Sequence, residues 1–294
     1  MMRDPPRPAP AAAGPDVWQR HPLDVDAADA QVAQSMALLE GATAGPALRW
    51  YWADRPTLIL GVFQPPELIN QAACAARAIP IVRRRSGGTG VLAGPPLLSL
   101  DIALPPGHRL AAPDVTESYR WLGEAWRATL QALGVGHTRL IPIAEVRATA
   151  QRPLRRLPPA DQRLSDEELA QLACFGTVSP YEVAIGPRKL VGLAQVRRRS
   201  GVLFQVGLPL TWQAELLAEL LAARPDDRAR LAGLLRARAI GLDALLPAVP
   251  PPAAIMAAFE QVLTGDWAVQ IQPVPADAGG AALVDTLGRN PYNG

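Results

Sequence analysis

The chain of 294 residues is 49% apolar and carries a formal net charge of only +2 at neutral pH. This length and apolar content allow one sizeable core, and the near-neutral charge argues against nonspecific nucleic-acid binding as the main task. Two cysteines, Cys74 and Cys174, are too few for a disulfide scaffold. No apolar run of about 18 residues is present, so no membrane-spanning helix is expected.

The first half of the chain begins with a Pro- and Ala-rich segment, 1–15, which lacks the apolar stretch of a signal peptide and predicts a disordered tail. A reducing cytoplasm is therefore the expected location. The elements expected next are a helix over 27–39, strands over 47–52 and 57–62, a helix over 66–77, and strands over 79–84 and 97–103.

The second half opens with a strong amphipathic helix over 117–133, capped by Asp114 or Thr116 and ended by Gly134. A Pro- and Arg-rich stretch over 152–168 is expected to be a loop that leads into a short helix. After the cysteine loop come strands over 181–185, 189–197 and 202–208, and helices over 213–222, 226–238 and 252–264. Because the strands come in hairpins rather than between regular crossover helices, the pattern predicts an α+β fold. We expect one catalytic domain over 16–265 and a C-terminal tail over 266–294.

A glycine-rich turn follows the strand that ends near residue 84. Arg83, Arg84 and Arg85 stand directly before Ser86-Gly87-Gly88-Thr89-Gly90. Glycines allow a close approach to a ligand, and guanidinium groups bind carboxylate or phosphate in a bidentate way. The spacing fits neither a dinucleotide fingerprint nor a P-loop. A plain basic hairpin turn is the competing interpretation.

One thiol and one lysine lie close together in the sequence, Cys174 and Lys189, fifteen positions apart (189 − 174 = 15). A thiolate can carry an acyl group when positive charge lies nearby, and an ammonium group can hold a carbonyl oxygen. The pair therefore suggests acyl transfer. A buried core cysteine and a solvated strand lysine are the alternatives.

The other reactive side chains form no recognisable site. Cys74 lies in a helical, alanine-rich segment and is expected in the core. His21, His108 and His137 are scattered, so neither a catalytic triad nor a zinc site is predicted. The triplet over 197–199 is interpreted as a solvated hairpin turn or as a contact for an acidic protein.

Three ordered blocks resemble the lipoate–protein ligase and octanoyltransferase family, relatives of the biotin ligases. Residues 48–64 look like its first hairpin, RRRSGGTGVL over 83–92 like its RRxSGGxAV lipoyl-binding loop, and GPRKLVGLAQ over 186–195 like its GRKlvGsAQ segment with one residue inserted. The resemblance implies a mixed β-sheet flanked by helices, as in class II aminoacyl-tRNA synthetases and biotin ligases.

The resemblance also implies roles for individual residues. Lys189 would contact the acyl carbonyl or an acyl-adenylate, and Cys174 would match the nucleophile of the octanoyltransferase branch. Substrate-binding positions carried over from the glycine loop and the third block are Arg83, Arg84, Ser86, Gly87, Gly88, Gly192 and Ala194. No metal ligand is expected.

The chain departs from the family pattern at three places. Ala93-Gly94-Pro95 stands where the family has a histidine, often followed by aspartate. Gln205-Val206-Gly207-Leu208 replaces its HHGS or QHGS strand, and Leu193 replaces the serine of GSA. These departures argue against adenylate binding and admit a member with an altered substrate. The cysteine, and C-terminal helices that do not clearly match the accessory domain of classical ligases, favour the transferase branch.

The resulting hypothesis is an acyltransferase that needs no cofactor. It would move an octanoyl or lipoyl group from acyl carrier protein, through a Cys174 thioester, to a lysine of a lipoyl-domain or glycine-cleavage H-type carrier protein. The first alternative is a lipoate–protein ligase that uses ATP and Mg²⁺ and does not need Cys174. The second is an accessory protein that binds lipoate or octanoate without turnover. Biotin ligation is disfavoured because the GRGRxG-type loop is absent. Neither nucleic acid nor membrane is expected as a partner.

Overall fold

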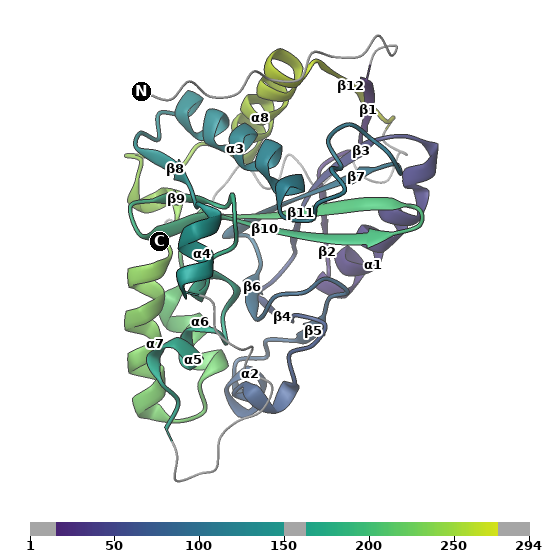
Figure 1. Ribbon diagram of the computed structural model, residues 1–294. Helices are drawn as coiled ribbons and strands as arrows, with labels where there is room; N and C mark the ends of the chain where they lie inside the picture. Colours follow the sequence, from purple (N-terminus) through teal and green to yellow (C-terminus); the bar gives the residue numbers. More distant parts are fainter. Residues whose placement is uncertain (1–15, 150–162, 276–294) are drawn as a thin grey trace.

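A nine-stranded mixed sheet forms the centre of the computed structural model, which describes residues 16–149 and 163–275 (Figure 1). Its order is β12-β1-β3-β7-β11-β10-β9-β8, with β2 beside β3. The strands are β1 Asp16–Arg20, β2 Asp24–Asp26, β3 Ala47–Ala53, β7 Leu97–Leu104, β8 Thr138–Leu140, β9 Val183–Ile185, β10 Arg188–Arg198, β11 Gly201–Pro209 and β12 Val269–Pro273. The sheet is mixed because β1 pairs in parallel with β3 and β12, and β2 with β3, whereas the other pairs are antiparallel.

The β10–β11 hairpin contains the two longest strands of this sheet and passes beside the site described below. Its register joins Gly192 to Gly207 and Arg198 to Gly201. Gly201 has φ +146°, and a Cβ there would lie 2.1 Å from the carbonyl oxygen of Leu104. Only glycine therefore allows the hairpin to turn this close to β7.

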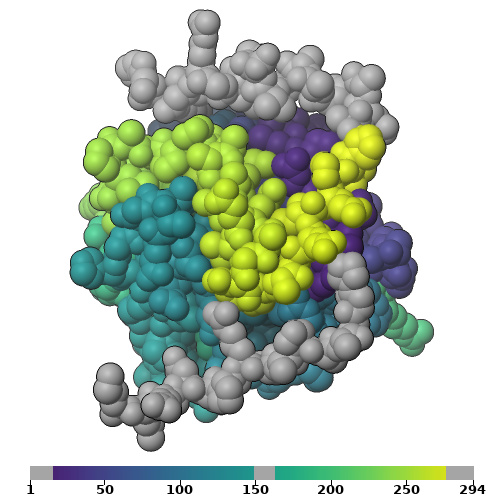
Figure 2. All heavy atoms as spheres, turned by 90° about the horizontal axis from the view of Figure 1, so that it is seen from above, coloured from purple at the N-terminus to yellow at the C-terminus, as the bar shows by residue number. Residues whose placement is uncertain are grey.

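Two helices cover one face of the sheet, and a third lies on the other. Helices α3 (Arg120–Ala132) and α8 (Pro252–Trp267) pack on each other and form adjacent surfaces in Figure 2, teal and yellow. Beneath them, the rings of Trp50, Trp126 and Phe259 have centroids 4.8–6.0 Å apart. Helix α1 (Ala28–Glu40) packs on β3, β7 and β11.

A second, smaller layer lies below the main sheet in Figure 1. It contains a three-stranded sheet, β5-β4-β6 (Ile81–Arg83, Thr57–Leu60 and Val91–Ala93), and the helices α2 (Gln71–Ala76), α5 (Asp166–Ala170), α6 (Ala214–Leu221) and α7 (Pro225–Arg238). Its own core includes Leu58, Leu169, Leu217 and the predicted core residue Cys74, which is 1% exposed. The remaining elements are α4 Ile143–Thr149 and the 3₁₀ turns η1 Gly41–Ala44, η2 Pro66–Leu68, η3 Glu117–Tyr119, η4 Cys174–Gly176 and η5 Leu242–Ala244.

The structure confirms the predicted α+β class with a mixed sheet flanked by helices. Strands β1, β2, β6, β8 and β12 and helix α4 were not predicted, and β12 lies in the segment expected as a tail. The helix expected over 66–77 is divided into η2 and α2, because Asn70 caps α2 by accepting a hydrogen bond from the N–H of Ala73 (3.2 Å). The predicted tail 1–15 and residues 276–294 lie outside the described residues. Within the described ranges, no helix is both long and apolar enough to cross a bilayer.

Candidate active site

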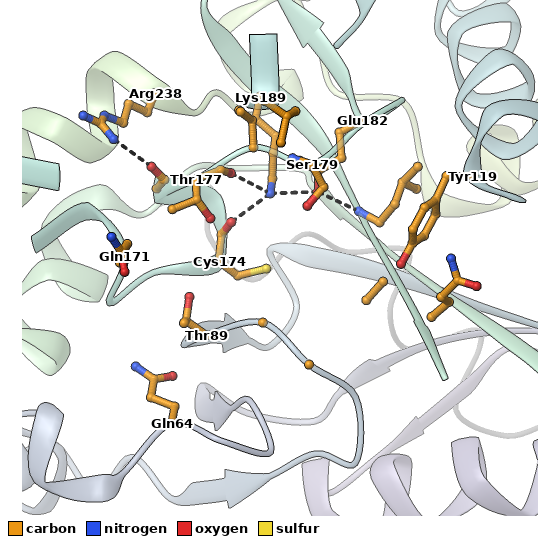
Figure 3. A pocket seen from close by; sticks show the side chains of 18 of the residues that line it. Gln64, Thr89, Tyr119, Gln171, Cys174, Thr177, Ser179, Glu182, Lys189 and Arg238 are labelled. Carbon is orange, nitrogen blue, oxygen red and sulfur yellow. Dashed lines mark hydrogen bonds and ion pairs between the residues drawn. The ribbon is translucent and has the colours of Figure 1, made fainter. Parts of the chain in front are cut away.

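A cavity of about 660 Å³ opens where the two layers meet (Figure 3). The glycine turn, the η4 turn, β10 and the η3 turn before α3 all contribute to its wall. The lining residues used below are Gln64, Arg84, Gly87, Gly88, Thr89, Tyr119, Glu167, Cys174, Thr177, Glu182, Lys189, Leu193, Ala194, Gln195 and Arg238. The sequence segments that predicted a site therefore converge on one cavity.

Cys174 begins the η4 turn, and its sulfur points into this cavity in Figure 3. Two backbone hydrogen bonds tie the turn to the glycine loop: Cys174 N–H donates to Gly90 O (2.8 Å), and Gly90 N–H donates to Leu172 O (3.0 Å). A guanidinium nitrogen of Arg84 lies 3.8 Å from Cys174 Sγ. Positive charge beside the sulfur stabilises the thiolate form, which is the nucleophile.

Lys189 is buried, with 1% of its side chain exposed, and lies directly behind the η4 turn. Its ammonium donates to Cys174 O (2.8 Å), to Thr177 O (3.1 Å) and to a carboxylate oxygen of Glu182 (2.9 Å). An ammonium group has three donors, so protein acceptors use all of them. In this structure Lys189 therefore positions the backbone of the cysteine turn, and holding a substrate oxygen would require it to release one of these acceptors.

Glu182 is the site residue to which the sequence analysis assigned no role. Besides Lys189, its carboxylate accepts the N–H groups of Ser179 (2.7 Å) and Leu193 (3.0 Å). Burial raises the pKa of Glu182, and the Lys189 ammonium and the two N–H groups oppose that rise. The signal that could have revealed it was a charged residue inside the strand predicted over 181–185.

A second, narrower pocket of about 80 Å³ begins at the same cysteine and runs along the main sheet. Arg84, Cys174, Leu193 and Ala194 line both cavities. The pocket exists because two paired residues of the hairpin, Gly192 and Gly207, have no side chain. A Cβ at Gly192 would lie 3.2 Å from Cζ of Phe175 and would intrude on this space.

The opposite wall of the large cavity carries Tyr119 in Figure 3. Burial is the main cause that raises the pKa of Tyr119 to about 12, so the phenol stays neutral at physiological pH. Next to it on this wall, Gln195 donates from Nε2 to Val115 O (2.8 Å). Tyr119 also packs against the main core, where its ring meets that of Phe204 edge to face.

The predicted substrate-binding residues divide into two groups. Those that line one or both cavities are Arg84, Gly87, Gly88, Gly192 and Ala194. Arg83 and Ser86 line neither cavity: Arg83 donates to the carbonyl oxygens of Gly61, Val62 and Gln64, and Ser86 is buried behind the loop. These two residues support the loop rather than face the cavities.

The histidines do not take part in this site. None of His21, His108 and His137 lines either cavity. His108 instead contacts Asp16, with 3.0 Å between Nε2 and the carboxylate. Among the described residues, thiol chemistry in this cavity therefore has no histidine base close by.

Comparison with known proteins defines the class to which this fold and site belong. Residues 27–264 match the lipoyl protein ligase A/B catalytic domain, and the chain therefore belongs to that family, as the three sequence blocks predicted. It is 28% identical to octanoyltransferase LipM of an Exiguobacterium species over 244 residues, 82% of each chain. It is 31% identical to octanoyltransferase LipM of Moorella thermoacetica over 230 residues, 78% of this chain and 77% of the relative.

Solved structures agree on the fold. A bipartite lipoate protein ligase of Thermoplasma acidophilum superimposes with a TM-score of 0.62 at 16% identity, covering 92% of this chain and 91% of the other. A lipoate-protein ligase A bound with ATP gives 0.60 at 16% identity, over 92% and 93%. At this identity the likeness establishes the shared architecture of the catalytic domain.

Proposed function

We propose that this protein is an octanoyltransferase of protein lipoylation that carries the acyl group on Cys174. The observation that supports this most directly is the position of the sulfur at the junction of two cavities, the large one open to solvent and the narrow one largely apolar. An acyl chain can occupy the narrow pocket while its carbonyl carbon stays beside the sulfur. The donor or acceptor then approaches through the large cavity.

In the first step, the Cys174 thiolate attacks the carbonyl carbon of a donor thioester. The new bond joins Sγ to this carbon, the bond to the donor sulfur breaks, and the donor leaves as a thiol with the proton that Cys174 gave up. Arg84, 3.8 Å from Sγ, supplies the positive charge next to the reacting atoms. Lys189 and Glu182 hold the turn on which the sulfur is mounted.

In the second step, the ε-amine of a carrier lysine attacks the thioester carbonyl of the acyl-enzyme. An amide bond forms, the bond to Cys174 breaks, and the proton lost by the amine returns to the thiol. The donor is already activated as a thioester, so the proposed reaction uses neither ATP nor Mg²⁺. We propose acyl carrier protein as the donor and a lipoyl-domain or glycine-cleavage H-type protein as the acceptor.

The comparisons support this proposal over the ligase alternative. The relatives at 28% and 31% identity both carry the name octanoyltransferase, whereas the ligases are similar at 16% and agree only in fold. A cysteine at the cavity junction is required by the transferase mechanism and has no assigned task in ATP-dependent activation.

The test is the intact mass of the protein after incubation with octanoyl-acyl carrier protein. We expect one octanoyl adduct on the wild type and on Cys74→Ala, and none on Cys174→Ala. Cys74 is the matched control because it is the other cysteine and is buried in the second core. Addition of a lipoyl-domain acceptor should then remove the adduct.

Other outcomes would reject the proposal. An adduct that persists in Cys174→Ala would exclude this residue as the acyl carrier. No adduct on the wild type, combined with acceptor modification that depends on lipoate and ATP, would establish the ligase. Binding of octanoate without turnover from either donor would instead identify an accessory protein.

A further inference from the structure

The narrow pocket carries polar side chains on β3, β7 and β11 in addition to an apolar lining that includes Ala28, Val32 and Ala53. Val91, Ala93, Leu97 and Phe175 are among its apolar lining residues. Besides Arg84 next to the sulfur, the polar residues that line it are Gln31, Tyr51, Ser99 and Gln205. We infer that Tyr51, Ser99 and Gln205 form an end wall that limits the length of the acyl chain by its polarity. This inference rests on the proposed function and adds the determinant of its substrate.

The register of the main sheet gives the position of this wall. Gly192 pairs with Gly207, Gly207 with Ser99, and Ser99 with Tyr51, so the four residues form one row across β10, β11, β7 and β3. Neighbouring strands lie about 4.8 Å apart, which places Ser99 about 10 Å and Tyr51 about 14 Å from Gly192. Because Gly192 lies next to the η4 turn, a chain attached to Cys174 meets the wall with its far end.

A buried ion pair holds the wall in place. Asp101 is fully buried and accepts hydrogen bonds from Arg49 (2.9 Å), from Tyr51 Oη (3.3 Å) and from Gln205 Nε2 (3.3 Å). Helix α1 supports the same arginine, because Arg49 also donates to the side chain of Gln31 (2.6 Å). Tyr51 and Gln205 are thus tied to a buried carboxylate and cannot turn away from an apolar chain at low cost.

Ser99 has hydrogen-bonding capacity that the protein does not use. Within the described part of the chain its hydroxyl makes no hydrogen bond, and it faces the pocket. An apolar carbon placed against this hydroxyl removes its water and offers no partner, which lowers affinity by about fivefold to 100-fold. Each methylene buried in an apolar channel instead raises affinity about fourfold. Chains should therefore bind more tightly with each added carbon until they reach the wall, and more weakly beyond it.

The test compares three pantetheine thioesters, octanoyl, decanoyl and 10-hydroxydecanoyl, as donors to Cys174. The readout is the rate of adduct formation relative to octanoyl in the same protein, so that a general loss of activity cancels. We expect decanoyl to be at least about fivefold slower than octanoyl, and the ω-hydroxyl to recover most of that loss. Ser99→Ala should bring decanoyl to within about twofold of octanoyl. Ser118→Ala, which removes a buried hydroxyl outside both cavities, should leave the ratio as in the wild type.

Equal rates for decanoyl and 10-hydroxydecanoyl, or a ratio unchanged by Ser99→Ala, would overturn the inference and leave the transferase mechanism intact. No adduct with any donor would instead count against the proposed function. In that case, binding of octanoate, decanoate and 10-hydroxydecanoate to Cys174→Ser still decides the inference. The hydroxylated acid must bind more tightly than decanoate, and Ser99→Ala must abolish that difference.

Discussion

Replacing Glu182 with glutamine should destabilise the protein far more than loss of a surface charge. Glu182 and Lys189 are each 1% exposed, and their charged atoms lie 2.9 Å apart. Removing one partner of such a buried pair costs about 3–5 kcal/mol of unfolding free energy, because the other charge stays buried and unpaired. An exposed pair contributes below about 1 kcal/mol. Glutamine can still accept from the N–H of Leu193, but its amide nitrogen would face the N–H of Ser179, so the expected loss of about 3 kcal/mol combines the missing charge with one lost hydrogen bond.

The assay is urea unfolding, extrapolated linearly, of Glu182→Gln, Lys189→Met and the double variant. The double variant has no unpaired charge, so it should lose at least about 2 kcal/mol less than the sum of the two single losses. Acylation of Cys174 should fall in all three variants, because the carbonyls of Cys174 and Thr177 lose or weaken their shared donor. Single losses below about 1 kcal/mol, or additive losses in the cycle, would refute the buried-pair interpretation.

Two further predictions concern the loop and the turn around the sulfur. Gly61→Ala would put a Cβ 1.8 Å from Gly88 O, so it should lower the free energy of unfolding by at least about 1–3 kcal/mol and slow acylation of Cys174. The control is Gly233→Ala in α7, where a Cβ meets nothing within 4 Å. This change should raise the free energy of unfolding by about 0.5–1 kcal/mol. Equal urea midpoints for the two variants would contradict this. The hydrogen bond from Arg238 holds the pKa of Glu167 below its usual range. The pair therefore stabilises the fold fully at pH values above 4.5, the pKa of the unfolded state, and this stabilisation is lost as the pH falls through the lower pKa of the folded state. Glu167→Gln should therefore lower stability by up to about 1 kcal/mol at neutral pH and by less at about pH 3, and an equal effect at both would disprove the linkage.

The elements that the sequence predicted well are long and strongly periodic. The helix expected over 117–133 is present as η3 and α3, and the two strands of the β10–β11 hairpin lie within two residues of their expected bounds. Strands β1 and β12 were missed for the opposite reason. Each has five residues, and each gains its parallel partner only when segments about 250 residues apart in the chain meet.

In the candidate site, too, the sequence predicted some features, whereas others depend on how distant segments pack. Residue types and family motifs predicted that Cys174, Lys189 and the glycine loop would act together, and the structure brings them to one cavity. Which side chains face that cavity depends on packing, so Arg83 and Arg84, adjacent in the sequence, point to different surroundings. The three acceptors of the Lys189 ammonium likewise depend on packing and could not be predicted from the sequence. Only the folded chain shows that its donors are already in use.

The hydrogen bonds that tie Cys174 and Leu172 to Gly90 also affect how the enzyme is made. The guanidinium that meets the sulfur belongs to a residue 90 positions earlier in the chain. An unfolded or partly synthesised chain therefore presents an ordinary thiol, because neither the guanidinium nor the narrow pocket is beside it. The complete site exists only when both layers have assembled, so acyl donors should modify this cysteine more slowly in the nascent chain than in the folded protein.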